Sequence, residues 1–241
     1  AYTAYAAAAS ILGRFLSAAQ DKKPGDDDVT NEILIYAELE DVYAALIAAV
    51  HVDPARRVPQ EWRDTMAGGV YKGKGKPIDG ITSYRWLCFT SGLAKLYEAF
   101  LLYRAEPTVF PDEGQSIGCN GVDVRQLIVL IMERAVEREA RKLTTLMLMD
   151  DAVRGFPSTS HEGSMLALVD EGARGGVTAG LAALIDGARI FPVIAPGQIA
   201  EPFVVDFGIW EGRRASPRQF GAQTRGTLAA ARRTAGLVGR S

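Results

Sequence analysis

Apolar residues recur at intervals of three and four along several long stretches of this chain, and this spacing constrains the fold more than any other feature. In the clearest stretch, residues 28–50, Ile33, Tyr36 and Tyr43 share one face, and neither Gly nor Pro interrupts it. Such spacing is typical of a helix with one buried face, because a helical turn takes 3.6 residues. A short carboxylate at Asp27 or Asp28 can cap its first turn. The sequence therefore predicts a mainly α fold.

Other stretches extend this prediction to most of the chain. The further expected helices are a first helix at 3–19, a short helix at 59–66, an apolar helix at 81–104, a long helix at 122–153, two shorter helices within 162–190 and a last helix at 223–237. Gly172 and the Gly175-Gly176 pair divide the stretch at 162–190, because glycine weakens a helix interior. No period of 20–50 residues repeats, which argues against a solenoid.

Two of these helices are expected to form the core. Apolar and aromatic residues lie nearly all round the helix at 81–104, a pattern typical of a buried helix. Its predicted core residues are Phe89, Leu93, Leu96 and Phe100. The helix at 122–153 has a predicted buried stripe that includes Leu127, Ile128, Ile131, Ala135 and Val136. On its charged face, Glu137 is placed to pair with Arg141 one turn later.

The segment at 191–210 (FPVIAPGQIAEPFVVDFGIW) has no helical period. Phe203, Val205 and Phe207 alternate with other residues as in a half-buried strand. Its three prolines cannot donate to a strand ladder, so the segment is expected to be an edge strand or an extended arm. We therefore expect four regions, namely an N-terminal helical arm at 1–20, a helical body at 26–190, an extended or β arm at 191–212 and an Arg-rich tail at 213–241.

Charge is distributed unevenly between the body and the tail. Residues 1–212 contain 20 Lys and Arg against 29 Asp and Glu, a net charge of −9, whereas residues 213–241 contain seven Arg and no acid. Such asymmetry indicates a partner for the tail, which is nucleic acid, an acidic face of a neighbouring subunit or the acidic body of its own chain. The candidate contact residues are Arg213, Arg214, Arg218, Arg225, Arg232 and Arg233 in the tail, with Lys72, Lys74 and Lys76 in a glycine-rich loop.

No complete catalytic motif is present. The stretch 68–75 (GGVYKGKG) resembles part of a phosphate-binding loop, but Gly75 replaces the Ser or Thr that would hold magnesium, and no hydrophobic strand precedes it. His161 lies among hydroxyl residues that are expected to cap a helix beginning at Glu162. His51 follows a helix end, where we expect it to act as a cation facing the helix dipole.

Metal, cofactor and membrane sites are not expected either. Cys88 lies among apolar residues and is expected to be buried, while Cys119 has no neighbouring base to activate it. The aspartate clusters at 26–28 and 150–151 lack the spacing of a calcium loop. No apolar run reaches the length of about 18 residues that a membrane helix needs. The Ala-rich start carries Arg14 and lacks a basic first segment, so it reads poorly as a signal peptide.

These features favour a non-catalytic structural subunit of a homo-oligomeric assembly. The expected example is a viral or phage virion protein, such as a head–tail connector, neck or coat component, assembled in the host cytoplasm from copies of itself and neighbouring assembly proteins. The alternative is a helical, nucleocapsid-type protein that binds nucleic acid through the basic tail and the lysine loop. A third class, an enzyme whose site is assembled from dispersed residues around His161 and Glu162, stays open.

Overall fold

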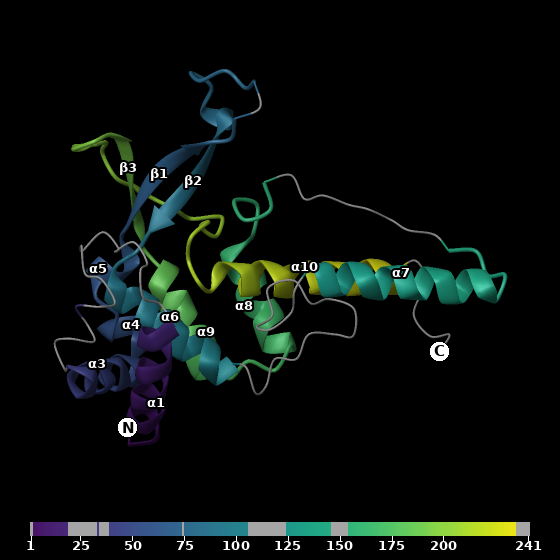
Figure 1. Cartoon of the computed structure of the whole chain (residues 1–241). Coiled ribbons are helices and arrows are strands. Elements are labelled where there is room, and N and C mark those ends of the chain that lie inside the picture. Colours follow the sequence, from purple (N-terminus) through teal and green to yellow (C-terminus); the bar gives the residue numbers. More distant parts are fainter. Residues whose placement is uncertain are drawn as a thin grey trace.

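A computed structural model describes residues 2–18, 33, 39–73, 75–105, 124–145 and 154–234. Within them a bundle of helices carries a β-sheet that projects from one end, and two long helices extend to the side (Figure 1). The helices are α1 (Tyr2–Ala18), α3 (Glu40–Val52), α4 (Pro54–Arg57), α5 (Gln60–Arg63), α6 (Gly92–Ala105), α7 (Val124–Ala140), α8 (His161–Asp170), α9 (Gly175–Ile185) and α10 (Ser216–Thr234).

The sheet corrects the prediction of a mainly α fold. Its five strands are β1 (Thr65–Tyr71), β2 (Tyr84–Phe89), β3 (Arg189–Ala195), β4 (Gln198–Ile199) and β5 (Phe203–Val204). The order is β2-β1-β3-β4, with β5 also paired to β3. β1 runs antiparallel to β2 and parallel to β3, with Thr65 opposite Ile190. The fold therefore combines helices with a substantial mixed sheet.

The single helix predicted at 81–104 is wrong. A 3-10 turn (Ile81–Ser83) and strand β2 occupy its first third, and α6 begins only at Gly92. The six residues of β2 are apolar except for Arg85, and periodicity alone does not separate so short a strand from a segment of buried helix. The pairing with β1 decides in favour of a strand. β1 itself occupies the last residues of the predicted helix at 59–66 and the first residues of the glycine-rich loop.

Strand β3 lies inside the sheet, so the prediction of an edge position is wrong for this strand, whereas β4 and β5 of the same segment do lie at the edge. β1 pairs with one side of it, and β4 and β5 pair with the other. β5 pairs at Arg189 and Ile190, whereas β4 pairs at Val193 and Ala195. Pro192 falls between these two short pairings, so its missing N–H is tolerated at an interior strand.

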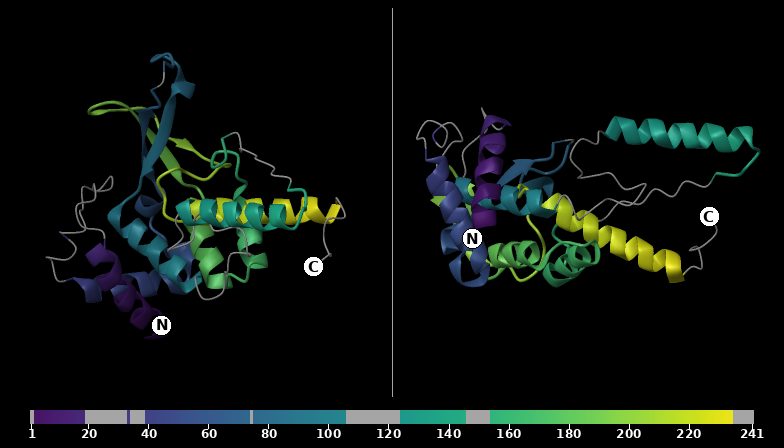
Figure 2. Two further views of the ribbon diagram at one scale, coloured as in Figure 1. Left: turned by 45° about the vertical axis from the view of Figure 1, so that its right-hand side comes forward. Right: turned by 90° about the horizontal axis from the view of Figure 1, so that it is seen from below.

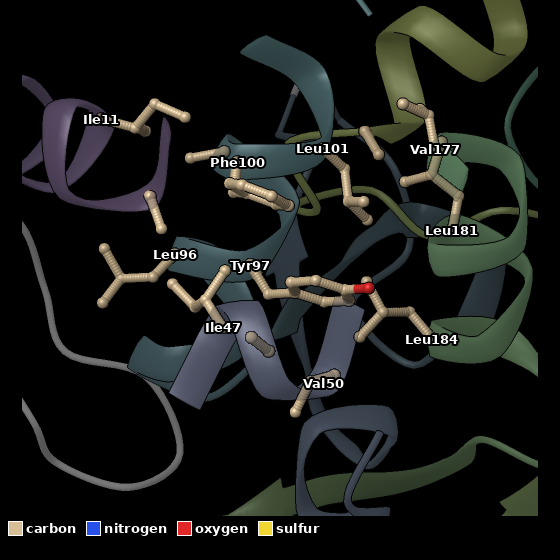
Figure 3. Packing of buried hydrophobic residues seen from close by; sticks show 14 of the residues in the cluster. Ile11, Ile47, Val50, Leu96, Tyr97, Phe100, Leu101, Val177, Leu181 and Leu184 are labelled. Carbon is tan, nitrogen blue, oxygen red and sulfur yellow. The ribbon is translucent and has the colours of Figure 1, made fainter. Parts of the chain in front are cut away.

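The main core lies where α1, α3, α6 and α9 meet (Figure 3). Leu96 and Phe100 are buried as predicted, at 2% and 0% exposure, while Leu93 is half-buried and Phe89 lies half-buried on β2. α9 approaches α6 closely at Gly180, where a Cβ would lie 2.7 Å from a Leu101 methyl carbon. This glycine therefore fixes the spacing of the two helices.

Helix α1, the predicted N-terminal arm, packs against its own chain. Ala8 and Leu12 are each only 1% exposed, and they face α3 and α6 in the core. Tyr5 donates a hydrogen bond of 2.6 Å to Asp41 in the acidic first turn of α3. This bond is the largest cause of a raised pKa at Tyr5. The remainder of the predicted arm and its linker lie outside the described residues.

Helix α7 differs most from its prediction. It ends at Ala140, where Lys142 adopts a left-handed φ of 55°, and not near Val153. Of the predicted buried stripe, Ile128 is 51% exposed and Val136 is 64% exposed, so that prediction is wrong for the isolated chain. The predicted pair of Glu137 and Arg141 is confirmed at 2.7 Å. Figure 2 shows α7 standing away from the remainder of the described chain.

Other expectations are confirmed with shifted bounds. The stretch at 162–190 does contain two helices, α8 and α9, and they are separated at Gly172. Ser160 caps α8 by accepting a hydrogen bond of 3.1 Å from the backbone N–H of Gly163. The tail helix α10 begins at Ser216, seven residues before its predicted start. Among the described residues, no helix has the length and apolar character to cross a bilayer.

Candidate interaction surfaces

The root of the basic tail is buried in the body through an ion pair. Arg213 Nε lies 2.7 Å from Glu98 Oε1, and the side chains are 3% and 1% exposed. Arg213 also donates to the carbonyl of Leu184 at 3.1 Å and lies over the Trp210 ring, 4.6 Å from its centroid. The second oxygen of Glu98 accepts the backbone N–H of Arg214 at 2.9 Å. The carboxylate therefore holds the tail at the start of α10.

A second tail arginine is also neutralised within the chain. Arg225 on α10 forms a two-pronged hydrogen bond with Glu171 at the end of α8, with Nη2 donating to Oε2 at 2.8 Å. Both side chains are largely buried, at 12% and 15% exposure. Two of the six candidate arginines therefore have the body of the same chain as their partner, which is one of the three partners that the charge asymmetry indicated.

The other tail residues are placed only in part. Arg214 is exposed and Arg218 is half-buried on the first turn of α10. The side chains of Arg232 and Arg233 lie outside the described residues. The tail and the lysine loop are not brought together, since the loop lies at the tip of the projecting hairpin and α10 extends to the side (Figure 1).

The lysine loop joins β1 to β2 and forms the tip of this hairpin. Lys72 and Lys76 are exposed, and the Lys72 ammonium donates to the carbonyl of Thr82 at 2.9 Å. Gly73 and Gly75 have φ values of 67° and 70°, which only glycine adopts readily. Lys74 lies outside the described residues.

Aromatic side chains line one face of the same hairpin. Tyr71 lies opposite Tyr84 across the two strands, and Trp86 follows on the same face of β2. The ring centroids are 5.6 Å apart for the two tyrosines and 6.4 Å apart for Tyr84 and Trp86. Tyr71 and Trp86 are each 39% exposed. We call these three residues the aromatic ladder.

Helix α7 carries the largest run of exposed apolar side chains. Its exposed apolar residues are Ile128 (51%), Val129 (54%), Leu130 (47%), Ile131 (42%), Met132 (62%) and Val136 (64%). These five consecutive residues and Val136 occupy every side of the helix, since successive side chains turn by about 100°. Scattered surface apolar residues need no explanation, but a contiguous patch of this kind marks an interaction site.

His51 and Cys88 lie among core residues. His51 lies edge-on to Phe100, with ring centroids 4.9 Å apart, and its Nδ1 lies 3.4 Å from the Tyr97 hydroxyl. His51 lies in the last turn of α3, as predicted, but burial and then the nearby Arg104 charge lower the pKa of His51, which disfavours the predicted cation. Burial raises the pKa of the Cys88 thiol to about 12, as expected of a buried, unreactive cysteine.

His161 begins α8, next to the capping residue Ser160, and its ring has a contact that the sequence did not predict. Its Nε2 lies 2.6 Å from the carbonyl oxygen of Gly208, which joins the start of α8 to the segment before the tail. Glu162, the other residue of the dispersed-enzyme alternative, is exposed. No group of three or more potential metal ligands occurs within the described ranges. Cys119 lies outside those ranges.

Comparison with known proteins gives no family assignment: no protein-family model and no curated protein matches the chain.

Two features were not predicted from the sequence. One is the pair of acids, Glu98 and Glu171, that hold the tail, and the other is the aromatic ladder. Glu98 offered a signal, because it is the only acid between residues 80 and 105 in a strongly apolar stretch. A carboxylate that is buried in such a stretch requires a cationic or hydrogen-bonding partner. The aromatic ladder has no such signal in the sequence, because Tyr71 falls in a predicted loop and Tyr84 and Trp86 fall in a predicted helix.

Proposed function

We propose that the protein is a non-catalytic structural subunit of a homo-oligomeric assembly, in which neighbouring copies bury helix α7. The observation that carries this proposal is the exposure of apolar side chains all round the first half of α7. A helix that is apolar on every side belongs in an interior. Most of the stability of a helix in a protein comes from the packing of its apolar face, which the exposed side chains of α7 lack within the described chain.

The second half of α7 supports copies of the same chain as the partner. It carries charges of both signs, and Glu137 accepts hydrogen bonds from Arg134 at 3.2 Å and from Arg141 at 2.7 Å. A surface with both signs is compatible with a second copy of itself, whereas one strong sign would favour an oppositely charged partner. Most assemblies of soluble proteins are symmetric homo-oligomers.

Within this class we propose a virion component, such as a head–tail connector, neck or coat protein. A projecting helix that packs on the next copy makes a head-to-tail contact, and such contacts close into rings or extend into helical filaments. The pairing of a basic tail with a neighbour's acidic body contributes less than the sequence indicated, because Arg213 and Arg225 already pair within the chain.

Sedimentation equilibrium of the full chain tests the proposal. In the test variant, Val129, Met132 and Val136 are each replaced by Gln, a good helix former that removes the apolar surface. In the control variant, Leu166, Val169 and Leu228 are replaced by Gln, because they are exposed to comparable degrees, 57%, 50% and 40%, on α8 and α10.

We expect the wild-type chain and the control variant to sediment as oligomers, and the α7 variant as the 25.9 kDa monomer with unchanged helical circular dichroism. A wild-type monomer throughout the micromolar range contradicts the proposal. An α7 variant that assembles like wild type contradicts the role of α7.

A further inference from the structure

The β1–β2 hairpin has a charge opposite to that of the remainder of the body. Residues 65–89 contain three lysines and one arginine against a single acid, Asp79, a net charge of +3, whereas residues 1–212 as a whole have −9. Lys72, Lys76 and Arg85 are exposed. The hairpin projects from the helices, so these cations lie away from the acidic body (Figure 1).

The aromatic ladder adds a second kind of contact to the same projection. Tyr71, Tyr84 and Trp86 form one row on a two-stranded platform, and the strand opposite Trp86 carries Gly69, which has no side chain to cover the indole. Exposed aromatic rings beside cations are a combination that single-stranded nucleic acid uses, because bases stack on the rings and phosphates contact the cations. The Tyr71 hydroxyl donates to the carbonyl of Lys76, so Lys76 lies beside the ladder, whereas strand alternation places Arg85 on the opposite face of the hairpin.

A second copy of the chain is a poorer occupant of this edge. The backbone N–H of Cys88 points out of the sheet edge, where it donates to Glu211 at 2.7 Å. By alternation, the backbone groups of Tyr84 and Trp86 also face outward and are the ones a new strand would pair with. In the register that puts a two-fold axis at Arg85, Tyr84 would face Trp86 and the two Arg85 side chains would be opposed. Like charges directly opposite each other destabilise a strand pair.

We propose that the hairpin is a binding site for single-stranded nucleic acid, with bases stacked on Tyr71 and Trp86 and phosphates held by Lys76 of the lysine loop. The site does not depend on α7 or on assembly. The sequence also indicated the lysine loop as a nucleic-acid contact, together with the tail arginines. In this proposal the aromatic ladder takes the place of the tail arginines.

Trp86 gives a direct readout, because the other two tryptophans, Trp62 and Trp210, are only 4% and 5% exposed, against 39% for Trp86. The probes are short single strands of deoxythymidine and of uridine, and the α7 Gln variant defined above provides a background without assembly. We expect each probe to quench the tryptophan fluorescence of that background, and the Trp86→Phe variant, which keeps a ring, to bind without the quenching.

Binding of a dye-labelled strand, followed by anisotropy, tests stacking and charge separately. Trp86→Ala is expected to weaken binding about 5- to 150-fold, the loss of one stacked base. Tyr103→Ala is the matched control, because Tyr103 on α6 has the same 39% exposure as Tyr71 and is expected to leave affinity unchanged. Replacing Lys76 by Gln should flatten the dependence of log affinity on log salt by about 0.7, for the one phosphate that is no longer neutralised.

Three results would overturn the proposal: no quenching by either probe, equal affinity of Trp86→Ala and wild type, or an equal loss in Tyr103→Ala. A fourth result also overturns the proposal: Trp86 fluorescence that changes with protein concentration when no strand is present identifies the ladder as a contact between copies. Each of these results leaves the role of α7 in assembly untouched, since the α7 background removes that contact.

Discussion

Replacing Glu98 by Gln should be among the most destabilising single changes in the protein. The pair with Arg213 is 1% and 3% exposed, and the second carboxylate oxygen accepts the backbone N–H of Arg214. Glutamine keeps the shape and can still accept that N–H, so the main loss is the charge that compensates the buried guanidinium. Removal of one partner of a buried ion pair costs about 3–5 kcal/mol. We expect that decrease in the free energy of unfolding, measured by urea denaturation followed by circular dichroism.

A double-mutant cycle separates the pair from its surroundings. Arg213→Gln alone should cost a similar amount, because it leaves the Glu98 carboxylate buried without a cation. The double variant, with two neutral amides, should cost no more than either single variant, since neither charge is then uncompensated. Additive costs, or a cost below about 1 kcal/mol for Glu98→Gln, would refute the inference that this ion pair holds the tail to the body.

Three further predictions concern the core. Phe100→Ala should lower the free energy of unfolding, measured by urea denaturation, by about 3–5 kcal/mol, because removal of a side chain with 0% exposure leaves a cavity. A decrease below about 1 kcal/mol would contradict the placement of Phe100 in the core. Gly180→Ala should destabilise by about 1–3 kcal/mol, measured the same way, since its methyl would meet Leu101 and the Tyr97 hydroxyl within 3 Å; a gain in stability would show that α6 and α9 are further apart. Burial lowers the pKa of His51, so its contribution to stability is present above the unfolded pKa of about 6.5 and is lost as pH falls below it; unfolding titrations at pH 7 and pH 5 should show this decrease in wild type and a smaller one in His51→Phe.

The local part of the fold could be predicted, and the long-range part could not. The helical stretches at 39–52, 92–105 and 161–185 follow from spacing and from glycine positions, which are local properties. The parallel pairing of β1 with β3 joins Thr65 to Ile190 across more than half of the chain, and nothing in either segment specifies the other. β1 contains a Gly-Gly pair, so its strand propensity is weak until its two neighbours pair with it.

The same distinction applies to the candidate surfaces. Charge counting identified the tail and the lysine loop, but it does not say which acids lie beside the arginines. Arg213 meets Glu98 across 115 positions, and Arg225 meets Glu171 across 54. The apolar stripe of α7 could be predicted from spacing, but its burial within the same chain is wrong. Periodicity identifies an apolar face and not what covers it.

Hydrogen exchange of the α7 amides at a series of protein concentrations tests the central claim most directly. If neighbouring copies bury this helix, amides from Val129 to Val136 will be protected at high concentration and will exchange faster on dilution, in step with dissociation. Amides of α6, such as that of Phe100, serve as the internal reference, because they lie in the core of each chain and should exchange independently of assembly. Exchange of the α7 amides at one rate across every concentration would contradict the account.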